Sequence, residues 1–179
     1  MEITLKDIYR SLGSLLGIDD ATAEKISQLE IEAEKAICRQ NPFIHSIYCQ
    51  CIEWRKRIAF ISDTYLPEPV IADLLRCNGY PTYEALLVSS AVGKTKWAGQ
   101  LYDEALARLA CPPARWLHIG DNRRADIRRP RKRGMATCHY KRCADRYAKD
   151  RVRSAAWMER GPSTPAGYVV QGLIINRLT

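Results

Sequence analysis

The segment LHIGDNRRADIRRPRKRG, residues 117–134, begins as a short apolar strand and ends as a run of basic residues. Two interpretations compete for it. In the first, the strand delivers Asp121, with Asp126 five residues later, to a divalent cation, because hard cations prefer carboxylate oxygens. In the second, the basic run binds the phosphate backbone of a nucleic acid. The function predicted for the chain depends on which interpretation the remaining residues support.

Length and composition narrow the class of protein. The chain has 179 residues and is 46% hydrophobic, which suits one domain with a core of its own. No apolar run approaches the ~20 residues of a membrane span, and the first residues, MEITLKDIYR, lack a signal-peptide pattern. The seven cysteines have no disulfide-scaffold spacing, which favours reduced thiols. We therefore expect a cytoplasmic protein with no membrane partner.

The charge is unevenly distributed. Residues 1–46 hold 5 Lys and Arg against 8 Asp and Glu, a net charge of −3, whereas residues 123–153 hold 13 against 3, a net charge of +10. The chain's net charge of +8 therefore resides in that second segment. No array of stacking aromatics or nucleic-acid-binding motif accompanies it, so we do not expect a nucleic-acid partner. A non-enzymatic binding module or a polyanion-binding protein that uses residues 123–153 stays the alternative.

Residues 1–56 predict helices only. Residues 4–7, TLKD, form a capping box. Apolar residues at helical spacing follow, and Gly17 is suited to end this first helix. A second helix follows and ends before Pro42, and a third covers about residues 43–53. We expect this segment to be a separate helical unit.

From residue 57 onward, short apolar runs alternate with helical patterns. Strands are predicted at 57–62, 85–89, 116–120 and 135–139, with helices at 69–77 and 96–110 and a short helix that opens at Asp126. This alternation predicts an α/β core over residues 57–140, a parallel sheet with helices on both faces. Residues 141–179 hold a basic helical stretch, a linker and a last apolar run, YVVQGLIINRL, at 168–178.

Polar residues follow three of the predicted strands. Ser62 and Asp63 end the first, Lys96 follows the second, and Asp121 ends the third, with Asp126 at the start of the next helix. Such groups gather at the carboxyl edge of a parallel sheet. A hydroxyl and an ammonium suit the oxygens of a phosphoryl group, and the carboxylate pair suits a hard divalent cation. The order and spacing together favour the acidic interpretation of residues 117–134.

In these residues the chain resembles the haloacid dehalogenase (HAD)-like hydrolase superfamily. Ser62 in IAFISD matches the family's second motif and Lys96 in SSAVGKTK its third, while Asp121 and Asp126 in HIGDNRRAD match the fourth, GD-x4-D. The strings SDTYLP, VSSAVGKTKWAGQLY and HIGDN are similar to a bacterial branch that often occurs beside or fused to glycosyltransferases. The resemblance covers roughly residues 1–140.

The resemblance implies a Rossmann-like α/β fold with an N-terminal helical cap formed by residues 1–56. It implies that Ser62, Asp63 and Lys96 bind phosphate, that Ser62 and Lys96 stabilise charge during catalysis, and that Asp121 and Asp126 bind Mg²⁺. A phosphorylated small molecule is the implied ligand, and association with a glycosyltransferase is implied by the branch.

One motif of the family is missing. Its first motif, DxDx(T/V), supplies the aspartate that becomes phosphorylated, and no D-x-D occurs in the 179 residues. Asp63 follows an apolar strand but is followed two residues later by Tyr65. Ser62 and Lys96 can stabilise charge but cannot replace a nucleophilic carboxylate. The resemblance therefore implies a truncated and catalytically impaired phosphohydrolase relative.

The missing motif also has a structural consequence. In the family its strand is central and lies between the strands that end in Ser62 and Asp121, so its loss is expected to expose two strand edges. The apolar content of residues 168–178 motivates the hypothesis that they fill this position without supplying an aspartate.

Overall fold

Two small parallel sheets form the centre of the structure, a computed structural model in which residues 2–141 are described. In the first, β1 (Ala59–Ser62) pairs with β2 (Ala85–Val88), and Ser62 lies opposite Val88. In the second, β3 (Leu117–Gly120) pairs with β4 (Ala136–His139), and Gly120 lies opposite His139. Each strand lies within a run predicted from the sequence, and both pairs are parallel because helices connect their strands.

The helices follow the predicted order, except that α5, directly after β2, was not predicted. They are α1 (Leu5–Leu16), α2 (Asp20–Ile37), α3 (Pro42–Glu53), α4 (Glu68–Cys77), α5 (Ser89–Val92), α6 (Gln100–Leu109) and α7 (Arg129–Arg131). A 3₁₀ turn, η1 (Pro113–Arg115), precedes β3, and a π-helical turn, η2 (Arg123–Arg128), follows it. Among residues 2–141, no helix combines the length and the apolar character needed to cross a membrane.

The predicted capping box at the start of α1 is confirmed. The Thr4 hydroxyl accepts a hydrogen bond from the backbone N–H of Asp7, and the Asp7 carboxylate accepts one from the N–H of Thr4 at 3.1 Å. Gly17 ends the helix in the left-handed conformation, with φ of 65°. Such caps satisfy the backbone groups that the ends of a helix leave unpaired, which is why local sequence fixes these boundaries.

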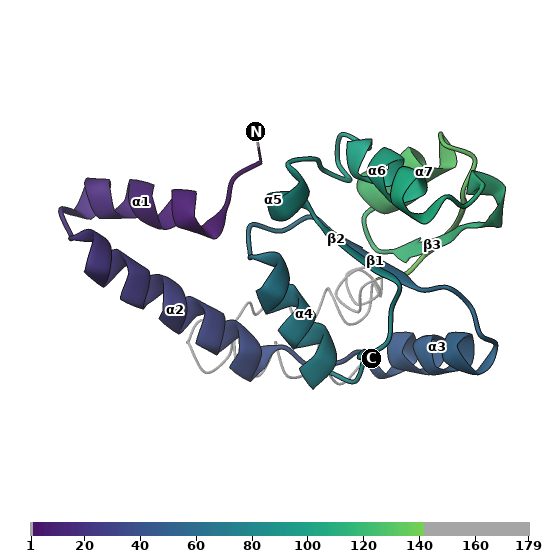
Figure 1. The fold of residues 1–179 in the computed structure, drawn as a ribbon, viewed down its shortest axis with the longest axis horizontal. Helices are drawn as coiled ribbons and strands as arrows, with labels where there is room; N and C mark the ends of the chain where they lie inside the picture. Colours follow the sequence, from purple (N-terminus) through teal and green to yellow (C-terminus); the bar gives the residue numbers. More distant parts are fainter. Residues whose placement is uncertain (1, 142–179) are drawn as a thin grey trace, which may run out of the picture.

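The α1–α2 hairpin extends to one side of the sheets (Figure 1). Its base is joined to the α/β part by a cluster of Leu5, Leu66 and Val70, all buried. The backbone N–H of Leu5 also donates to the carbonyl of Tyr65 at 2.9 Å. Burying an aliphatic side chain of this size contributes about 1.5–3 kcal/mol, so this cluster is the main attachment of the hairpin. A role of residues 1–56 as a cap over a site stays a prediction.

The interior of the α/β part lies between β2 and α6. Leu87, Leu101 and Ala105 are fully buried there, and Ile61 and Trp116 pack against them. β2 contacts both α4 and α6. The sheet pair β1–β2 is thus held by helices that the apolar spacing of the sequence predicts.

The single sheet expected from the sequence is not present in the described residues, which form two separate two-stranded sheets instead. Within residues 2–141 no strand pairs with the second edge of β1 or of β3. Every residue of β1 is only half-buried, and Leu117 at the start of β3 is 61% exposed. These are the two strands at which the sequence predicts exposed edges, and within residues 2–141 each has one unpaired edge. Residues 168–178, the hypothetical filler, lie outside the described residues, as do the predicted basic helix and linker.

Candidate phosphate site at the ends of β1 and β3

Asp63 connects the end of β1 to the loop that precedes α6. Its carboxylate accepts hydrogen bonds from the backbone N–H groups of Lys96 at 2.6 Å and Trp97 at 3.0 Å. Lys96 was predicted to open a helix, and this is wrong, because α6 begins at Gln100. Gly99 adopts a left-handed conformation, with φ of 97°, which breaks the helical path before that point. Lys96 therefore lies in a loop held against the end of β1.

Ser62 is the last residue of β1 and is half-buried. Its hydroxyl makes no hydrogen bond to another residue of the described range 2–141. The serines after β2 have a different use. The Ser89 hydroxyl accepts from the N–H of Thr64 at 2.9 Å, and the Ser90 hydroxyl donates to the carbonyl of Leu66 at 2.7 Å. They fix the loop after β1, which leaves Ser62 as the hydroxyl available to a ligand.

The Lys96 side chain forms a buried ion pair with Asp126. The distance from Lys96 Nζ to Asp126 Oδ1 is 2.8 Å, and the two side chains are 16% and 3% exposed. Asp126 lies inside η2, just after β3. Lys96 thus spans from the loop before α6 to the segment after β3, and it connects Asp63 at the end of β1 with Asp126.

Asp126 was predicted to cap the helix that follows β3, and this is wrong. The cap is Asn122, whose side-chain oxygen accepts from the N–H groups of Arg124 and Ala125, both at 2.9 Å. Asn and Asp serve equally well at this position, so sequence alone does not choose between them. The structure places Asp126 in the interior, where only a charged or hydrogen-bonded environment permits a carboxylate.

That environment comes from three donors and one neighbouring hydroxyl. Besides Lys96, the carboxylate of Asp126 has His118 Nε2 at 3.2 Å and Tyr102 Oη at 3.4 Å from Oδ1, and the N–H of Asn122 donates to Oδ2 at 2.9 Å. Burial alone would raise the pKa of Asp126, but the hydrogen bonds from His118 and Lys96 and the Lys96 charge outweigh it and hold the pKa well below its usual range. Asp126 is therefore an anion in the folded protein.

Sequence reasoning missed Tyr102 and His118. Tyr102 is fully buried, and burial, followed by the charge of Asp126, raises the pKa of its phenol far above the usual range. His118, on β3, contacts both Tyr102 and Asp126. One signal was available: side chains two apart on a strand share a face. His118 therefore shares its face with Gly120, the residue that Asp126 approaches.

The contacts of Asp126 decide whether it fits a magnesium ion. Both of its oxygens already receive donors from the protein, and one donor is a lysine ammonium at 2.8 Å. Mg²⁺ requires near-ideal octahedral coordination by oxygen, so Asp126 in this arrangement does not fit as a direct ligand. Asp121 is half-buried beside the end of β3, and its carbonyl oxygen lies 2.9 Å from His139 Nε2. Over residues 2–141, no three metal-ligating side chains converge. The Mg²⁺ prediction stays a prediction.

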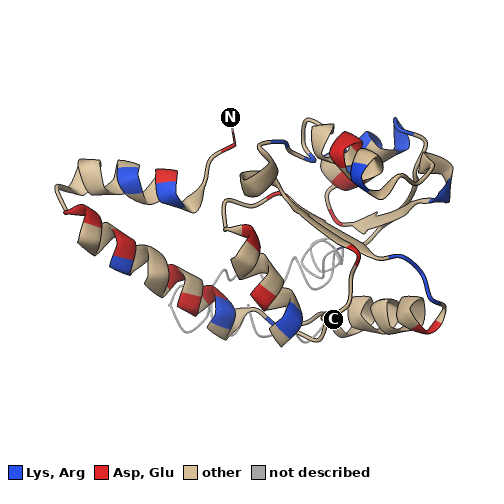
Figure 2. Cartoon of the chain, in the orientation of Figure 1, with Lys and Arg blue, Asp and Glu red and all other residues tan. Residues whose placement is uncertain are grey.

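Much of the basic run is engaged within the fold. The Arg124 guanidinium lies 4.1 Å from the centre of the Trp97 ring, and Arg129 Nε donates to the Trp97 carbonyl at 2.8 Å. Arg133 binds the carboxylate of Asp103 on α6 with both Nε and Nη2. Figure 2 shows basic and acidic residues side by side in this region. These contacts give three of the arginines a structural use, and the polyanion interpretation stays the alternative.

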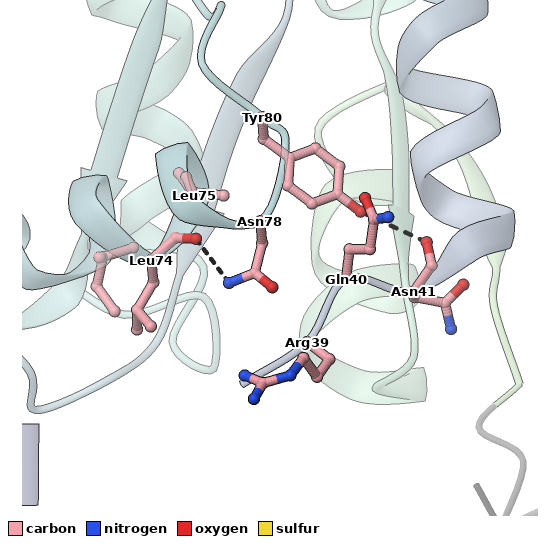
Figure 3. A pocket seen from close by; sticks show the side chains of 8 residues that line it. Arg39, Gln40, Asn41, Leu74, Leu75, Asn78 and Tyr80 are labelled. Atoms are coloured by element: carbon pink, nitrogen blue, oxygen red, sulfur yellow. Dashed lines mark hydrogen bonds between the residues drawn. The ribbon is translucent and has the colours of Figure 1, made fainter. Parts of the chain in front are cut away.

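A cavity of about 240 Å³ lies elsewhere, between α4 and the segment that joins α2 to α3 (Figure 3). Within it Asn78 donates to the Leu74 carbonyl at 2.9 Å, and the Tyr80 hydroxyl lies 3.5 Å from the carbonyl of Asn41. Its lining consists mainly of aliphatic and amide side chains, with one arginine, and includes none of the predicted site residues. The lining residues are Arg39, Gln40, Asn41, Ile71, Leu74, Leu75, Asn78 and Tyr80. The chemistry predicted from the sequence therefore does not lie in this cavity.

Comparisons with known proteins complete the description. No family model matches the chain, and no curated protein matches it. Among solved structures, the chain is similar to a HAD phosphatase from Thermococcus onnurineus, with 17% sequence identity and a TM-score of 0.45 over 77% of this chain and 77% of that one.

Proposed function

We propose that this chain is a HAD-like phosphohydrolase relative that binds the phosphoryl group of a phosphorylated small molecule through Ser62 and Lys96 and is catalytically impaired. The observation that carries the proposal is the position of Lys96. Asp63 holds its backbone against the end of β1, and Asp126 holds its ammonium beside the end of β3. A lysine fixed in this way is preorganised for an anion, and Ser62, the residue before Asp63, is the proposed second contact.

The ion pair with Asp126 does not use all the hydrogen-bond donors of the Lys96 ammonium. An ammonium group has three N–H donors, and Asp126 is the partner of its side chain within the described residues. The remaining Lys96 donors are the ones proposed to bind phosphoryl oxygens together with the Ser62 hydroxyl, while the Asp126 contact is kept. Because Asp126 balances the lysine charge, we expect the affinity for phosphate to be modest.

The proposed impairment rests on the absence of a free carboxylate nucleophile. No D-x-D occurs in the 179 residues. Asp63 is the carboxylate beside Ser62, but each of its oxygens accepts a backbone N–H, from Lys96 and from Trp97. A nucleophile must attack with an oxygen that is available, and the Asp63 oxygens are engaged in holding the loop.

The resemblance also assigns Mg²⁺ to Asp121 and Asp126. Because Asp126 does not fit as a direct ligand in this arrangement, the proposed binding step is assigned to Ser62 and Lys96 alone. Asp121 remains the candidate for a contact with a cation.

Calorimetric titration of the purified chain with inorganic phosphate tests the binding. Lys96→Gln is the test variant, and Lys94→Gln is its matched control, since Lys94 lies two residues away in a surface ion pair with Glu104 at 2.7 Å. We expect Lys96→Gln to weaken phosphate binding about tenfold or more, because a hydrogen bond to a charged group contributes about 1.5–3 kcal/mol. Lys94→Gln should bind as the wild type does.

Release of p-nitrophenol from p-nitrophenyl phosphate, with and without Mg²⁺, tests the impairment. We expect no release above that of the Asp121→Asn and Asp63→Asn variants. Mg²⁺-dependent release that Asp121→Asn abolishes would contradict the proposed impairment. Loss of that release in Asp63→Asn as well would identify Asp63 as a nucleophile.

A further inference from the structure

Three side chains from separate elements meet at one oxygen atom. Asp126 Oδ1 lies 2.8 Å from Lys96 Nζ, 3.2 Å from His118 Nε2 and 3.4 Å from Tyr102 Oη. His118 comes from β3 and Tyr102 from α6, and their exposed fractions are 12% for the His118 side chain and 0% for Tyr102. Neither residue is needed for the binding step proposed above, yet both are held against the carboxylate that binds Lys96.

The hydrogen-bond geometry assigns a direction to this network. Asp126 is paired with Lys96 and can only accept, so the contact between its Oδ1 and His118 Nε2 places the proton on Nε2, and the single hydrogen of the Tyr102 hydroxyl is left for the Ala125 carbonyl at 3.0 Å. The hydroxyl then accepts from His118 Nε2, which lies 3.0 Å away. This arrangement requires the proton on Nε2, where it also faces Asp126. The carboxylate is thus fixed by His118 at one oxygen and by the N–H of Asn122 at the other.

We propose that His118 and Tyr102 are positioning residues of the candidate phosphate site. His118 donates to Asp126, Tyr102 orients His118, and Asp126 in turn fixes the direction of the Lys96 ammonium. The other two N–H donors of the Lys96 ammonium then remain available for phosphoryl oxygens. The inference depends on the proposed function only for the identity of the ligand, phosphate; the positioning of Lys96 is independent of it. The inference also gives Asp126 the role of an internal counter-ion instead of that of a magnesium ligand.

Two variants of His118 separate a donor role from a packing role. His118→Leu keeps an apolar side chain in the space but removes the donor. His118→Gln carries an amide nitrogen near the position of Nε2, so it restores the donor without the ring. Tyr102→Phe removes only a hydroxyl. Tyr83→Phe is its matched control, because the Tyr83 hydroxyl has no hydrogen-bond partner within residues 2–141.

The first measurement needs no ligand. In protein labelled with ¹⁵N-lysine, the Lys96 ammonium should exchange its hydrogens slowly, since its ion pair is buried. The ammonium of Lys94, whose side chain is 44% exposed, is the internal reference. We expect hydrogen exchange at Lys96 to be about tenfold faster or more in His118→Leu and Tyr102→Phe, as for the loss of a charge-assisted hydrogen bond. His118→Gln and Tyr83→Phe should retain slow exchange.

Titration of the same variants with phosphate then tests whether the change at Lys96 also alters the affinity for phosphate. We expect His118→Leu and Tyr102→Phe to weaken phosphate binding several-fold and His118→Gln to restore it. Equal values for His118→Leu and wild type in both measurements would overturn the inference, as would a His118→Gln variant as defective as His118→Leu. If the wild type binds no phosphate, the proposed function fails, and the Lys96 exchange rates still decide whether His118 and Tyr102 position the lysine.

A Mg²⁺ titration tests the counter-ion role. Asp126→Asn should leave the calorimetric response to Mg²⁺ as it is in the wild type, whether or not the wild type binds the ion. A wild-type Mg²⁺ affinity that Asp126→Asn abolishes would overturn the assignment of Asp126 as a counter-ion.

Discussion

At the scale of single residues, Gly120 decides where Asp126 can lie. A Cβ atom added at Gly120 would lie 2.5 Å from both Cβ and Cγ of Asp126 and 2.7 Å from its Oδ2. The φ of Gly120 is not positive, so the requirement for glycine is one of space and not of backbone conformation. The close approach lets the Asp126 carboxylate reach Lys96 across the end of β3.

Gly120→Ala should therefore destabilise the protein by about 1–3 kcal/mol, the usual cost of forcing atoms into a packed interior. Gly13→Ala in α1 is the matched control. Its added Cβ would have its nearest neighbour at 3.5 Å, an ordinary contact, and alanine in a helix interior gains about 0.5–1 kcal/mol over glycine. Urea unfolding of both variants measures the difference. A Gly120→Ala protein as stable as the wild type would show that Asp126 is not held against β3.

The sequence predicted which residues gather here better than it predicted how they are arranged. Asp63, Lys96 and Asp126 lie in contact because each follows a strand of a parallel pair, and this is a consequence of topology. The inward position of Asp126 depends on Lys96, 30 residues away in sequence, and on His118. No local pattern contains that information, and for the same reason Tyr102 was missed.

At the scale of elements, boundaries set by local chemistry were predicted and those set by tertiary contacts were not. α1 begins after its capping box and ends before Gly17, and α3 begins at Pro42. α6 begins at Gln100, four residues later than predicted. The apolar spacing continues through Gly99, but the left-handed backbone conformation of Gly99 interrupts the helix. The single predicted sheet is not seen within residues 2–141, where the strands form two pairs, because strand patterns show which residues are extended but not which strands pair.

The attachment of the α1–α2 hairpin gives a prediction for alkaline pH. The Glu30 carboxylate on α2 accepts hydrogen bonds from the hydroxyls of Tyr9 at 2.6 Å and Tyr65 at 2.7 Å, and Tyr65 follows β1. The hydrogen bond to Glu30, together with burial, raises the pKa of Tyr9 from 10.0 to about 12. The neutral phenol is thus favoured by folding. Its stabilisation is fully present below pH 10.0 and is lost as the pH rises through about 12.

The free energy of unfolding of wild type minus that of Tyr9→Phe should accordingly be constant up to about pH 10 and decrease between pH 10 and 12. Chemical unfolding at a series of pH values measures it, with Tyr83→Phe as a control for general alkaline effects. A difference between wild type and Tyr9→Phe that increases over this range would contradict the assigned hydrogen bond between Tyr9 and Glu30.

At the scale of the whole molecule, the division into two sheets is the dominant feature. A two-stranded sheet is marginally stable by itself and depends on the helices that pack against it. β2 has such cover, and Leu87 is fully buried, whereas Leu117 on β3 is 61% exposed. Unpaired strand edges with apolar side chains are sites of self-association. We therefore expect the purified chain to associate in a concentration-dependent manner, which sedimentation velocity detects.

Two leucine variants test whether that edge is open in solution. Leu117→Lys should reduce the association and change the free energy of unfolding by no more than about 0.5 kcal/mol, as is usual for exposed positions. Leu87→Ala should cost about 2–5 kcal/mol, because it leaves a cavity in the interior. Urea unfolding at low protein concentration compares the two. If Leu117→Lys proved as costly as Leu87→Ala, Leu117 would be covered in solution, and the division of the sheet would not expose β3. If association persisted unchanged in Leu117→Lys, the contact between molecules would lie on another surface.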